Sequence, residues 1–246
     1  MEPLGVVIPS RQRPNILLSC LDQLSSFDNA DVLDVSIAVD DDLETYEAAL
    51  DFSNSKFFHT YVVSNTPGRV YSVKAFNLAA EKCIADKFVW IGDDAVFPKN
   101  GWIDVYIKSF NEAFPDGIGC FGSCASGAAL GMISKSFIKL NNNEFYSPEY
   151  NVHWADVELG LRAIMLGRYN FFSDKIGIGH HRDWSEKYSN IDSSLKYTLG
   201  KEDKKIFSER LECDFYLDKN KIINPIVFND DFHYSRVCMP LGMKRG

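Results

Sequence analysis

The chain has 246 residues, of which 46% are hydrophobic and 24% charged, enough to bury the core of a full domain. No stretch approaches the ~20 apolar residues of a membrane-spanning helix, and the apolar run at 4–8 is too short for a signal-peptide core. A net charge of −8 disfavours broad electrostatic capture of nucleic acid. The cysteines lack the paired spacing of a zinc site or a disulfide framework. We therefore expect a cytoplasmic protein with free thiols and no transmembrane segment.

The first half of the chain alternates short apolar runs with helical patterns. The runs are typical of strands buried in a parallel sheet, and apolar residues recur at helical spacing between them. The predicted strands are 4–8, 35–39, 58–63 and 88–91, and the predicted helices are 15–24, 43–52 and 70–83. This order predicts an α/β fold in which right-handed crossovers place helices on both faces of the sheet.

Polar residues follow each predicted strand directly. Ligands of open parallel sheets bind beyond the carboxyl ends of the strands, so these residues are candidates for a binding site. They are Ser10, Arg11 and Arg13 after the first strand, Asp40, Asp41 and Asp42 after the second, residues 65–69 after the third, and Asp93 and Asp94 after the fourth. One rim of the sheet is therefore expected to collect carboxylates and guanidinium groups.

The pair Asp93 and Asp94 is the most informative of these features. It ends the buried run FVWIG, and a second apolar run, AVF, follows it. Two adjacent carboxylates at the end of a buried strand are costly unless a cation or a polar ligand meets them. The pattern therefore indicates a metal-assisted active site, with an acidic surface turn as the alternative.

The second half of the chain differs from the first in composition and in residue pattern. Residues 117–131 are rich in small side chains, which allow a ligand or another backbone to approach closely. A strand is predicted at 129–133, a short helix from Lys135 and a polar loop at 141–151. Apolar spacing predicts a helix at 154–166, with Asp156 in its first turn and Gly167 as its stop. A strand pair at 169–179, which leads to His180, and a helix at 201–211 complete the pattern.

Taken in order, these motifs resemble a known family. They are the strand followed by PSRQR, the DDD after the second strand, Asp93-Asp94, the small-residue segment, the helix WADVELGLRAIMLG and the strand that ends at His180. Over residues 4–185 the set resembles the GT-A glycosyltransferases, particularly the inverting, family-2-like nucleotide-sugar transferases. The resemblance implies a GT-A fold, in which a Rossmann-like nucleotide-binding sheet with helices on both faces merges with an acceptor-binding half.

The resemblance also implies a division of the chain and an activity. Residues 1–185 form the expected catalytic domain, with 1–98 as the nucleotide-sugar-binding half and 99–185 as the acceptor-binding half, and 186–246 form a C-terminal appendage. The implied activity is metal-dependent transfer of a sugar from a nucleotide-diphosphate sugar, with UDP as the expected carrier, to a hydroxyl acceptor with inversion.

The family's metal site is expected at Asp93 and Asp94. Gly92 stands at the first position of the family's Asp-any-Asp motif, so the chain matches a variant with adjacent aspartates. The resemblance implies Asp94 as a direct ligand, Asp93 as a ligand or ribose contact, and His180 as a third ligand. His181 can exchange roles with its neighbour. Oxygen ligands suit Mg²⁺ or Mn²⁺, and one imidazole favours Mn²⁺.

The expected general base is Asp156. The family carries Glu-Asp at the start of the acceptor helix, and this chain has Ala155-Asp156, which retains the aspartate. Glu158 is the nearby alternative, and Arg162 is expected to support the helix or an acidic neighbour. A carboxylate at a rigid helix start can take the acceptor proton on the face opposite the leaving group.

The resemblance assigns the other rim residues to the donor. Asp40 or Asp41 is expected to accept hydrogen bonds from the base or ribose, and the arginines are expected to face the base or diphosphate. Tryptophans beside the catalytic elements can stack on a sugar or a base. The full set of expected substrate contacts is Pro9, Ser10, Arg11, Arg13, Asp40, Asp41, Arg69, Asp93, Trp154 and Trp184, with Trp102 ranked lower.

The same residues bear on other functional classes. The turn PSRQRP lacks the glycine-rich basic loop of a nucleotidyltransferase and the GxGxxG of a dinucleotide oxidoreductase. A non-catalytic nucleotide- or carbohydrate-binding protein of this fold stays open, because binding and turnover share most residues. The expected acceptor is a glycan, a lipid-linked sugar or a small molecule. The basic residues Lys201, Lys204, Lys205, Lys244 and Arg245 keep hydroxymethylated bases of phage DNA as an alternative acceptor.

Overall fold

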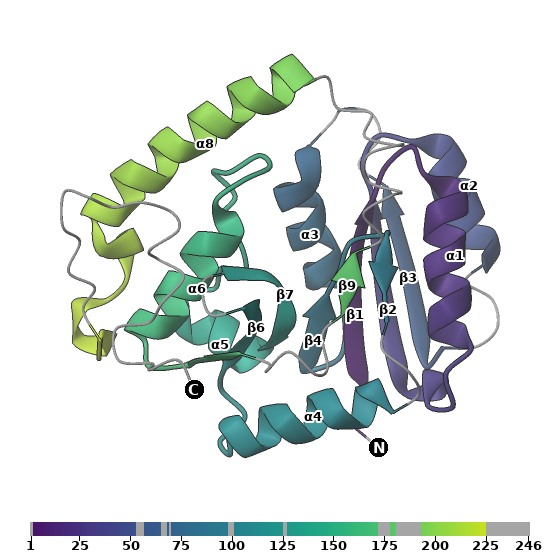
Figure 1. The fold of residues 1–246 in the computed structure, drawn as a ribbon, viewed down its shortest axis with the longest axis horizontal. Coiled ribbons are helices and arrows are strands. Elements are labelled where there is room, and N and C mark those ends of the chain that lie inside the picture. The colour runs from purple at the N-terminus through teal and green to yellow at the C-terminus, as the bar shows by residue number, and fades with distance from the viewer. Residues whose placement is uncertain are drawn as a thin grey trace.

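The fold is built on a mixed sheet whose first four strands are parallel. A computed structural model describes residues 2–52, 57–64, 68, 70–97, 101–124, 127–171, 178–180 and 193–224. Seven strands pair in the order β3-β2-β1-β4-β7-β6-β8, and β5 pairs with β9 apart from them (Figure 1). The strands are β1 (Leu4–Ser10), β2 (Leu33–Val39), β3 (His59–Ser64), β4 (Lys87–Trp90), β5 (Ala95–Val96), β6 (Cys120–Cys124), β7 (Gly127–Ser134), β8 (Tyr169–Phe171) and β9 (Gly179–His180).

Helices cover both faces of this sheet. They are α1 (Pro14–Ser25), α2 (Leu43–Phe52), α3 (Tyr71–Lys82), α4 (Trp102–Ala113), α5 (Lys135–Leu140), α6 (Ala155–Met165) and α8 (Ser193–Glu212), with short 3₁₀ turns η1 (Ala30–Val32), η2 (Asp214–Tyr216) and η3 (Lys219–Lys221). In the part of the chain that is described, no helix combines the length and apolarity needed to cross a bilayer.

Alternating strand residues divide the core into two layers. Val7 and Phe88 face a cluster shared with α3, α5 and α6, whereas Val6 and Val89 face a cluster shared with α1 and α4. This alternation follows from the period of two along a strand, and apolar residues on both faces are what a sheet covered by helices requires. The α/β fold with helices on both faces, predicted from the order of apolar runs, is confirmed.

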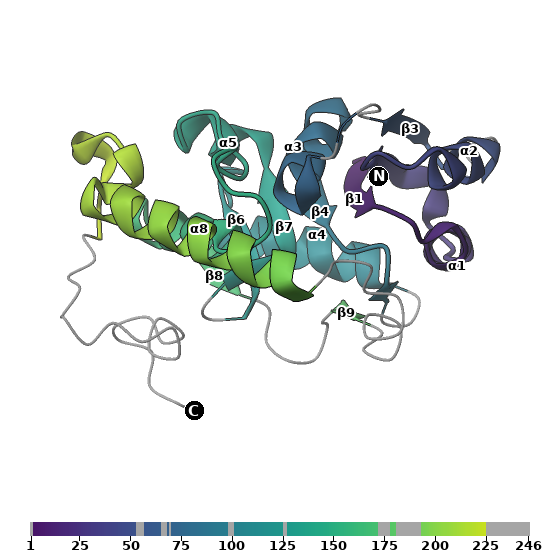
Figure 2. The same cartoon turned by 90° about the horizontal axis from the view of Figure 1, so that it is seen from above.

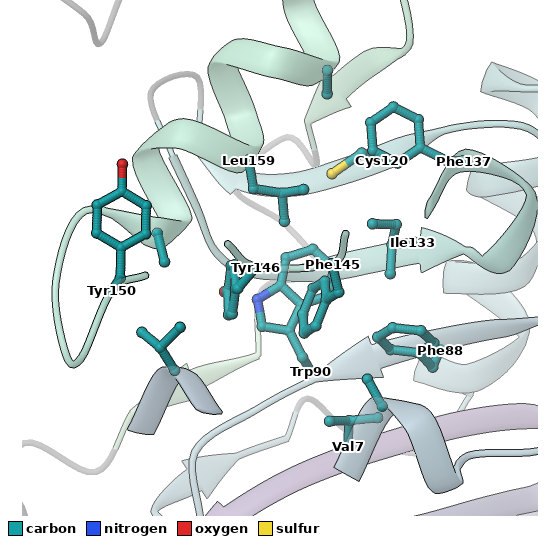
Figure 3. Close-up of a cluster of buried hydrophobic side chains, with 14 of the residues drawn as sticks. Val7, Phe88, Trp90, Cys120, Ile133, Phe137, Phe145, Tyr146, Tyr150 and Leu159 are labelled. Atoms are coloured by element: carbon teal, nitrogen blue, oxygen red, sulfur yellow. The ribbon is translucent and has the colours of Figure 1, made fainter. Parts of the chain in front are cut away.

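Three aromatic side chains, Trp90, Phe145 and Tyr146, pack together at the C-terminal end of β4. Trp90 packs edge-on against Phe145, whose ring stacks on Tyr146 at a centroid distance of 4.2 Å (Figure 3). Phe145 and Tyr146 belong to the loop between α5 and α6. The side-chain amide of Asn77 in α3 donates to the backbone carbonyl of Tyr146 at 2.9 Å and accepts from the backbone N–H of Tyr146 at 3.0 Å. The loop that precedes α6 is therefore packed against the parallel half of the sheet.

Parts of the second half differ from the prediction. The expected strand pair at 169–179 is wrong: β8 joins the main sheet parallel to β6, and β9 pairs with β5 instead. α4 was not predicted, and its Trp102 lies in the core with 2% of its surface exposed, in keeping with its low rank as a ligand contact. The helix predicted at 201–211 begins earlier, at Ser193. The cysteines whose side chains are described, Cys20, Cys83, Cys120 and Cys213, are free.

Helix α8 packs against the acceptor half although it belongs to the expected appendage 186–246. Phe207 of α8 and Phe215 beyond it share a buried cluster with Val157 and Leu161 of α6. Figures 1 and 2 show α8 running on the side of β6 and β8, far from α1 and α2. Through this shared cluster, α8 packs directly with α6, the helix that carries Asp156. The division of the chain at residue 185 stays a prediction.

The join between the two halves of the sheet depends on Gly131 of β7. A Cβ at this position would lie 1.9 Å from the carbonyl oxygen of Phe121 and 2.8 Å from the ring of Trp90. We predict that Gly131→Ala lowers the free energy of unfolding by about 1–3 kcal/mol, because the backbone must shift to admit the methyl group. Urea denaturation measures this, with Ser19→Ala on the exposed face of α1 as control. Equal stability of the two variants would contradict this packing.

Candidate active site

Asp93 is the centre of the rim where β1 and β4 end. Its side chain is fully buried, and the hydroxyl of Ser10 donates to Oδ2 at 2.6 Å. The guanidinium of Arg13 lies 2.9 Å from Oδ1. Ser10 ends β1, Arg13 stands at the N-cap position of α1 and Asp93 follows β4, so one carboxylate joins three elements. Three of the predicted rim residues are thus in direct contact.

Charge balance at this rim depends on Arg13. Burial raises the pKa of the Asp93 carboxyl to about 6, while Arg13 and Ser10 oppose that shift. A second nitrogen of Arg13 lies 3.9 Å from Oδ2 of Asp94, whose residue is 7% exposed. Arg13 therefore offsets part of the repulsion between the two adjacent carboxylates.

The three aspartates after β2, Asp40, Asp41 and Asp42, each accept a hydrogen bond from a backbone N–H of another segment, and for Asp42 the donor is Gln12. Asp40 accepts from the N–H groups of Val70 and Tyr71 at 2.8 and 3.1 Å, which caps α3. Asp41 accepts from Gly68 at 3.2 Å. These contacts satisfy backbone donors that lack a partner within the helix or loop. They give Asp40 and Asp41 structural roles, and their predicted contacts with a base or ribose stay predictions.

Strained backbone gathers at this same edge. Gln12, Asp41, Tyr71 and Trp154 are non-glycine residues with φ between 52° and 69°. Such conformations are costly for L-residues and persist where the surrounding structure holds them, commonly at functional sites. Tyr71 and Trp154 stand at the starts of α3 and α6. Both helix starts are thus fixed in unusual geometry.

Strand β9 brings the backbone of His180 beside the acidic pair. Its register places His180 opposite Ala95, the residue that follows Asp94. This is the chain position expected for a third metal ligand, although the described part of His180 is its backbone alone. Arg69, His181 and Trp184 lie outside the described residues.

Asp156 stands in the first turn of α6, as predicted. Burial raises the pKa of its carboxyl, and the backbone N–H of Val157 and the nearby His153 oppose that shift. Trp154 packs on Phe207 of α8 with ring centroids 4.8 Å apart. That packing engages a face of Trp154, and its predicted stacking on a sugar or base stays a prediction. A half-buried carboxylate with a raised pKa is suited to accept a proton.

Glu158, the alternative base, is engaged in a buried ionic network. Its carboxylate accepts from the hydroxyl of Tyr150 at 2.6 Å and from Arg162 at 3.0 Å. Arg210 of α8 adds a third partner at 2.8 Å. Because Glu158 is 1% exposed and surrounded by donors, its geometry favours a role in holding α6. Arg162 supports an acidic neighbour, as the sequence suggested.

The described residues fit a divalent cation only in part. No group of three or more His, Cys, Asp or Glu side chains gathers as a metal site within the described ranges. Asp93 is bound by Ser10 and Arg13, and the resemblance assigns the metal to its neighbour Asp94, which also lies near Arg13. Mg²⁺ is commonly held by one or two carboxylates together with substrate phosphates. A cation at this rim would therefore need ligands from a bound diphosphate in addition to the described carboxylates.

Arg11 places a further hydrogen-bond donor at the same rim. Its Nη1 donates to Gln12 at 3.1 Å, while its buried Nε has no hydrogen-bond partner among the described residues. An unpartnered guanidinium N–H is a donor that an anionic oxygen can satisfy. The predicted contact of Arg11 with a donor substrate stays a prediction.

Removal of Arg13 tests the charge balance of the rim. The folded-state pKa of Asp93, about 6, exceeds the ordinary value of 3.8, so ionisation of Asp93 opposes folding and stability falls as pH rises through this window. Arg13→Ala raises that pKa further. We predict a loss of about 3 kcal/mol in unfolding free energy at pH 8 and a smaller loss at pH 5. Chemical denaturation at both pH values measures the difference.

The matched control is the double variant Arg13→Ala, Asp93→Asn, which removes the buried charge together with its partner. It should be more stable at pH 8 than Arg13→Ala and should lack the extra pH dependence, because nothing at position 93 then titrates. A loss in Arg13→Ala that is independent of pH would show that Asp93 does not carry an uncompensated charge.

Comparisons with known proteins identify the fold. No protein-family model and no curated protein sequence matches the chain. A mannosyltransferase of Pyrobaculum calidifontis, PcManGT, solved with GDP-Man and Mn²⁺, superposes with a TM-score of 0.58 at 15% identity, over 71% of this chain and 56% of that one. The chain thus spans little more than half the length of PcManGT.

A second solved protein covers more of the chain. TarS of S. aureus, as a fragment of residues 1–349, superposes with a TM-score of 0.59 at 13% identity, over 89% of this chain and 73% of that one. Its complex with UDP-GlcNAc gives a TM-score of 0.58 at 13% identity, over 89% and 74%. The chain therefore has the GT-A-like glycosyltransferase fold that its motifs predict.

Proposed function

We propose that this protein is a metal-dependent glycosyltransferase that moves a sugar from a nucleotide-diphosphate sugar, UDP-linked, to a hydroxyl acceptor with inversion. The observation that carries the proposal is the ion-paired rim of Asp93, Asp94 and Arg13, together with a half-buried Asp156 at the start of α6. Solved structures of the same fold hold GDP-Man with Mn²⁺ or UDP-GlcNAc, which supports a sugar nucleotide as the ligand.

The donor half of the site consists of the strand ends. Pro9 and Ser10 end β1, and Arg11 and Arg13 follow it, so these residues lie where a nucleotide meets an open sheet. Arg11 supplies a buried N–H for a phosphate or base oxygen. Arg13 holds positive charge at the acidic pair, where it also favours an incoming diphosphate.

Asp94 and His180 are proposed to hold the divalent cation, Mn²⁺ or Mg²⁺. Asp94 follows β4, and the backbone of His180 lies across from the next residue, Ala95. A bound divalent cation stabilises the negative charge that develops on the leaving nucleoside diphosphate. Asp93 is proposed to orient Arg13 and the end of β1, because its buried carboxylate is engaged by Arg13 and Ser10.

Asp156 is proposed to accept the proton of the acceptor hydroxyl. It stands at the start of α6, and its raised pKa makes it a stronger base than an ordinary aspartate. The acceptor class remains as broad as the sequence suggests: a glycan, a lipid-linked sugar, a small molecule or modified DNA. Lys201, Lys204 and Lys205 are exposed on α8 but alternate with acidic residues, so they favour none of these.

Calorimetry with UDP tests the donor site. We predict that UDP binds tightly only with Mn²⁺ or Mg²⁺ present, and that Asp94→Asn weakens the metal-dependent affinity at least about ten-fold, because the variant loses a charged ligand. Asp22→Asn, at an exposed position of α1, removes the same charge away from the rim and serves as control. Unchanged metal-dependent affinity in Asp94→Asn would remove Asp94 from the metal site.

Kinetics of Asp156→Asn test the base. We predict that transfer falls about 10²- to 10⁴-fold while affinity for UDP and metal is retained. In the wild type, transfer should decline as pH falls through the pKa of Asp156, because a base acts only when it is ionised, and burial places this decline above the ordinary carboxyl range. The variant should lack the decline.

The stereochemistry of the product distinguishes an inverting mechanism from a retaining one. Near wild-type transfer by Asp156→Asn, with a product whose anomeric configuration matches the donor, would replace the inverting mechanism by a retaining one. A screen of sugar nucleotides by nucleotide release, with and without Mn²⁺, supplies the donor for both measurements.

A further inference from the structure

A buried carboxylate on α8 binds the loop that leads into α6. The N–H groups of Asn151, Val152 and His153 all donate to Asp203, at 2.9, 2.9 and 2.8 Å. The side-chain amide of Asn151 adds a contact at 3.3 Å. Asp203 is fully buried, so these donors replace the water that would otherwise solvate its charge. Successive backbone N–H groups around an anion form a strong, directional site.

The bound segment, residues 151–153, ends three residues before Asp156. Trp154 follows it in left-handed geometry with φ of 69°, and α6 begins at the next residue. Few backbone torsions therefore separate the anchored amides from the carboxylate that the proposed function assigns as base. A displacement of the 151–153 segment would therefore also move Asp156.

The opposite side of the segment is held by α3. The N–H of Val73 donates to the carbonyl of Asn151 at 3.1 Å. The first amides of α3 are in turn capped by Asp40 at the end of β2. The segment thus lies between the helix that borders the donor rim and α8, with hydrogen bonds to both.

Helix α8 is itself fixed on α6. Arg210 donates to both oxygens of Glu158 and also contacts Glu149. Gly200 allows close approach, because a Cβ there would lie 3.2 Å from the ring of His153. Phe207 packs on Trp154 between these two points. α8 is therefore anchored on either side of Asp203 in the sequence, which fixes the position of its carboxylate.

We propose that Asp203 is a positioning residue for catalysis: its carboxylate holds the 151–153 amides and thereby sets the place of Asp156 relative to the bound donor. This inference rests on the proposed function of Asp156 as base. It makes residues 193–212 part of the catalytic unit, although they lie in the segment that the sequence assigns to an appendage.

The test compares Asp203→Asn with Glu202→Gln, which removes the same charge from an exposed site on the same helix. An asparagine amide presents a donor where the carboxylate offered only acceptors, so the three N–H groups cannot all be satisfied. We expect faster hydrogen exchange at residues 151–153 and a fall in kcat of about 10- to 100-fold, with UDP affinity and donor KM unchanged. Glu202→Gln should behave as the wild type.

A double variant distinguishes positioning from a general structural effect. If Asp203 acts through Asp156, Asp203→Asn should lower kcat little further in the Asp156→Asn background, because the group it positions is already lost. Additive losses in the double variant, or unchanged kcat despite faster exchange at 151–153, would overturn the proposal. If Asp156→Asn alone has no effect, the base assignment fails, and the exchange data still report the anchoring.

Asp203→Glu keeps the test decisive if Asp203→Asn does not fold. Glutamate retains the charge and is one methylene longer, so it displaces the segment while it still accepts from the amides. We expect reduced kcat with unchanged UDP affinity in this variant. Wild-type kcat in Asp203→Glu together with altered exchange at 151–153 would contradict the proposed role.

Discussion

The ion pair between Asp93 and Arg13 is the interaction on which the site depends. A fully buried carboxylate is stable in a folded protein only when charge and hydrogen bonds compensate it, and Arg13 and Ser10 supply part of that compensation. The contact joins the ends of β1 and β4 to the start of α1. It therefore helps to fix the rim of the sheet beside Asp94, the carboxylate that is proposed to hold a cation.

From this rim, hydrogen bonds lead across the molecule to the acceptor side. Asp40 caps α3, α3 holds the carbonyl of Asn151, and Asp203 holds the amides of the same segment. The donor rim and Asp156 are thus connected by short carboxylate side chains that bind backbone groups and by one hydrogen bond between backbone groups. Such support is what a general base requires, because small displacements from reacting geometry reduce rates strongly.

The first half of the fold and much of the rim could be predicted from the sequence. Apolar runs located β1, β2, β3 and β4, and the rule that ligands meet the carboxyl ends of strands selected Ser10, Arg13 and Asp93, which are in contact. Helix α4 carried a readable signal, with buried residues at 102, 103, 106 and 110, that the prediction overlooked. The short strands β8 and β9 are stabilised by their pairing partners and carry little local signal.

The contacts of α8 could not be predicted. Asp203 lies about fifty residues from the amides that it binds, and within its own helix it resembles one more charged residue between Glu202 and Lys204. Local periodicity reports which face of a helix is apolar, and it does not report which distant loop an isolated carboxylate will meet. The same holds for Arg210 and Glu158, which belong to different elements.

The central claim is that the Asp93–Asp94 rim binds a nucleoside diphosphate together with a metal ion. The most direct measurement is a crystal structure of the protein soaked with UDP and Mn²⁺, with data collected to record the anomalous signal of manganese. The claim predicts an anomalous peak within about 2.0–2.4 Å of an Asp94 carboxylate oxygen, with diphosphate oxygens bound to the same ion. UDP bound away from this rim, or bound there with no anomalous peak beside Asp94, would contradict it.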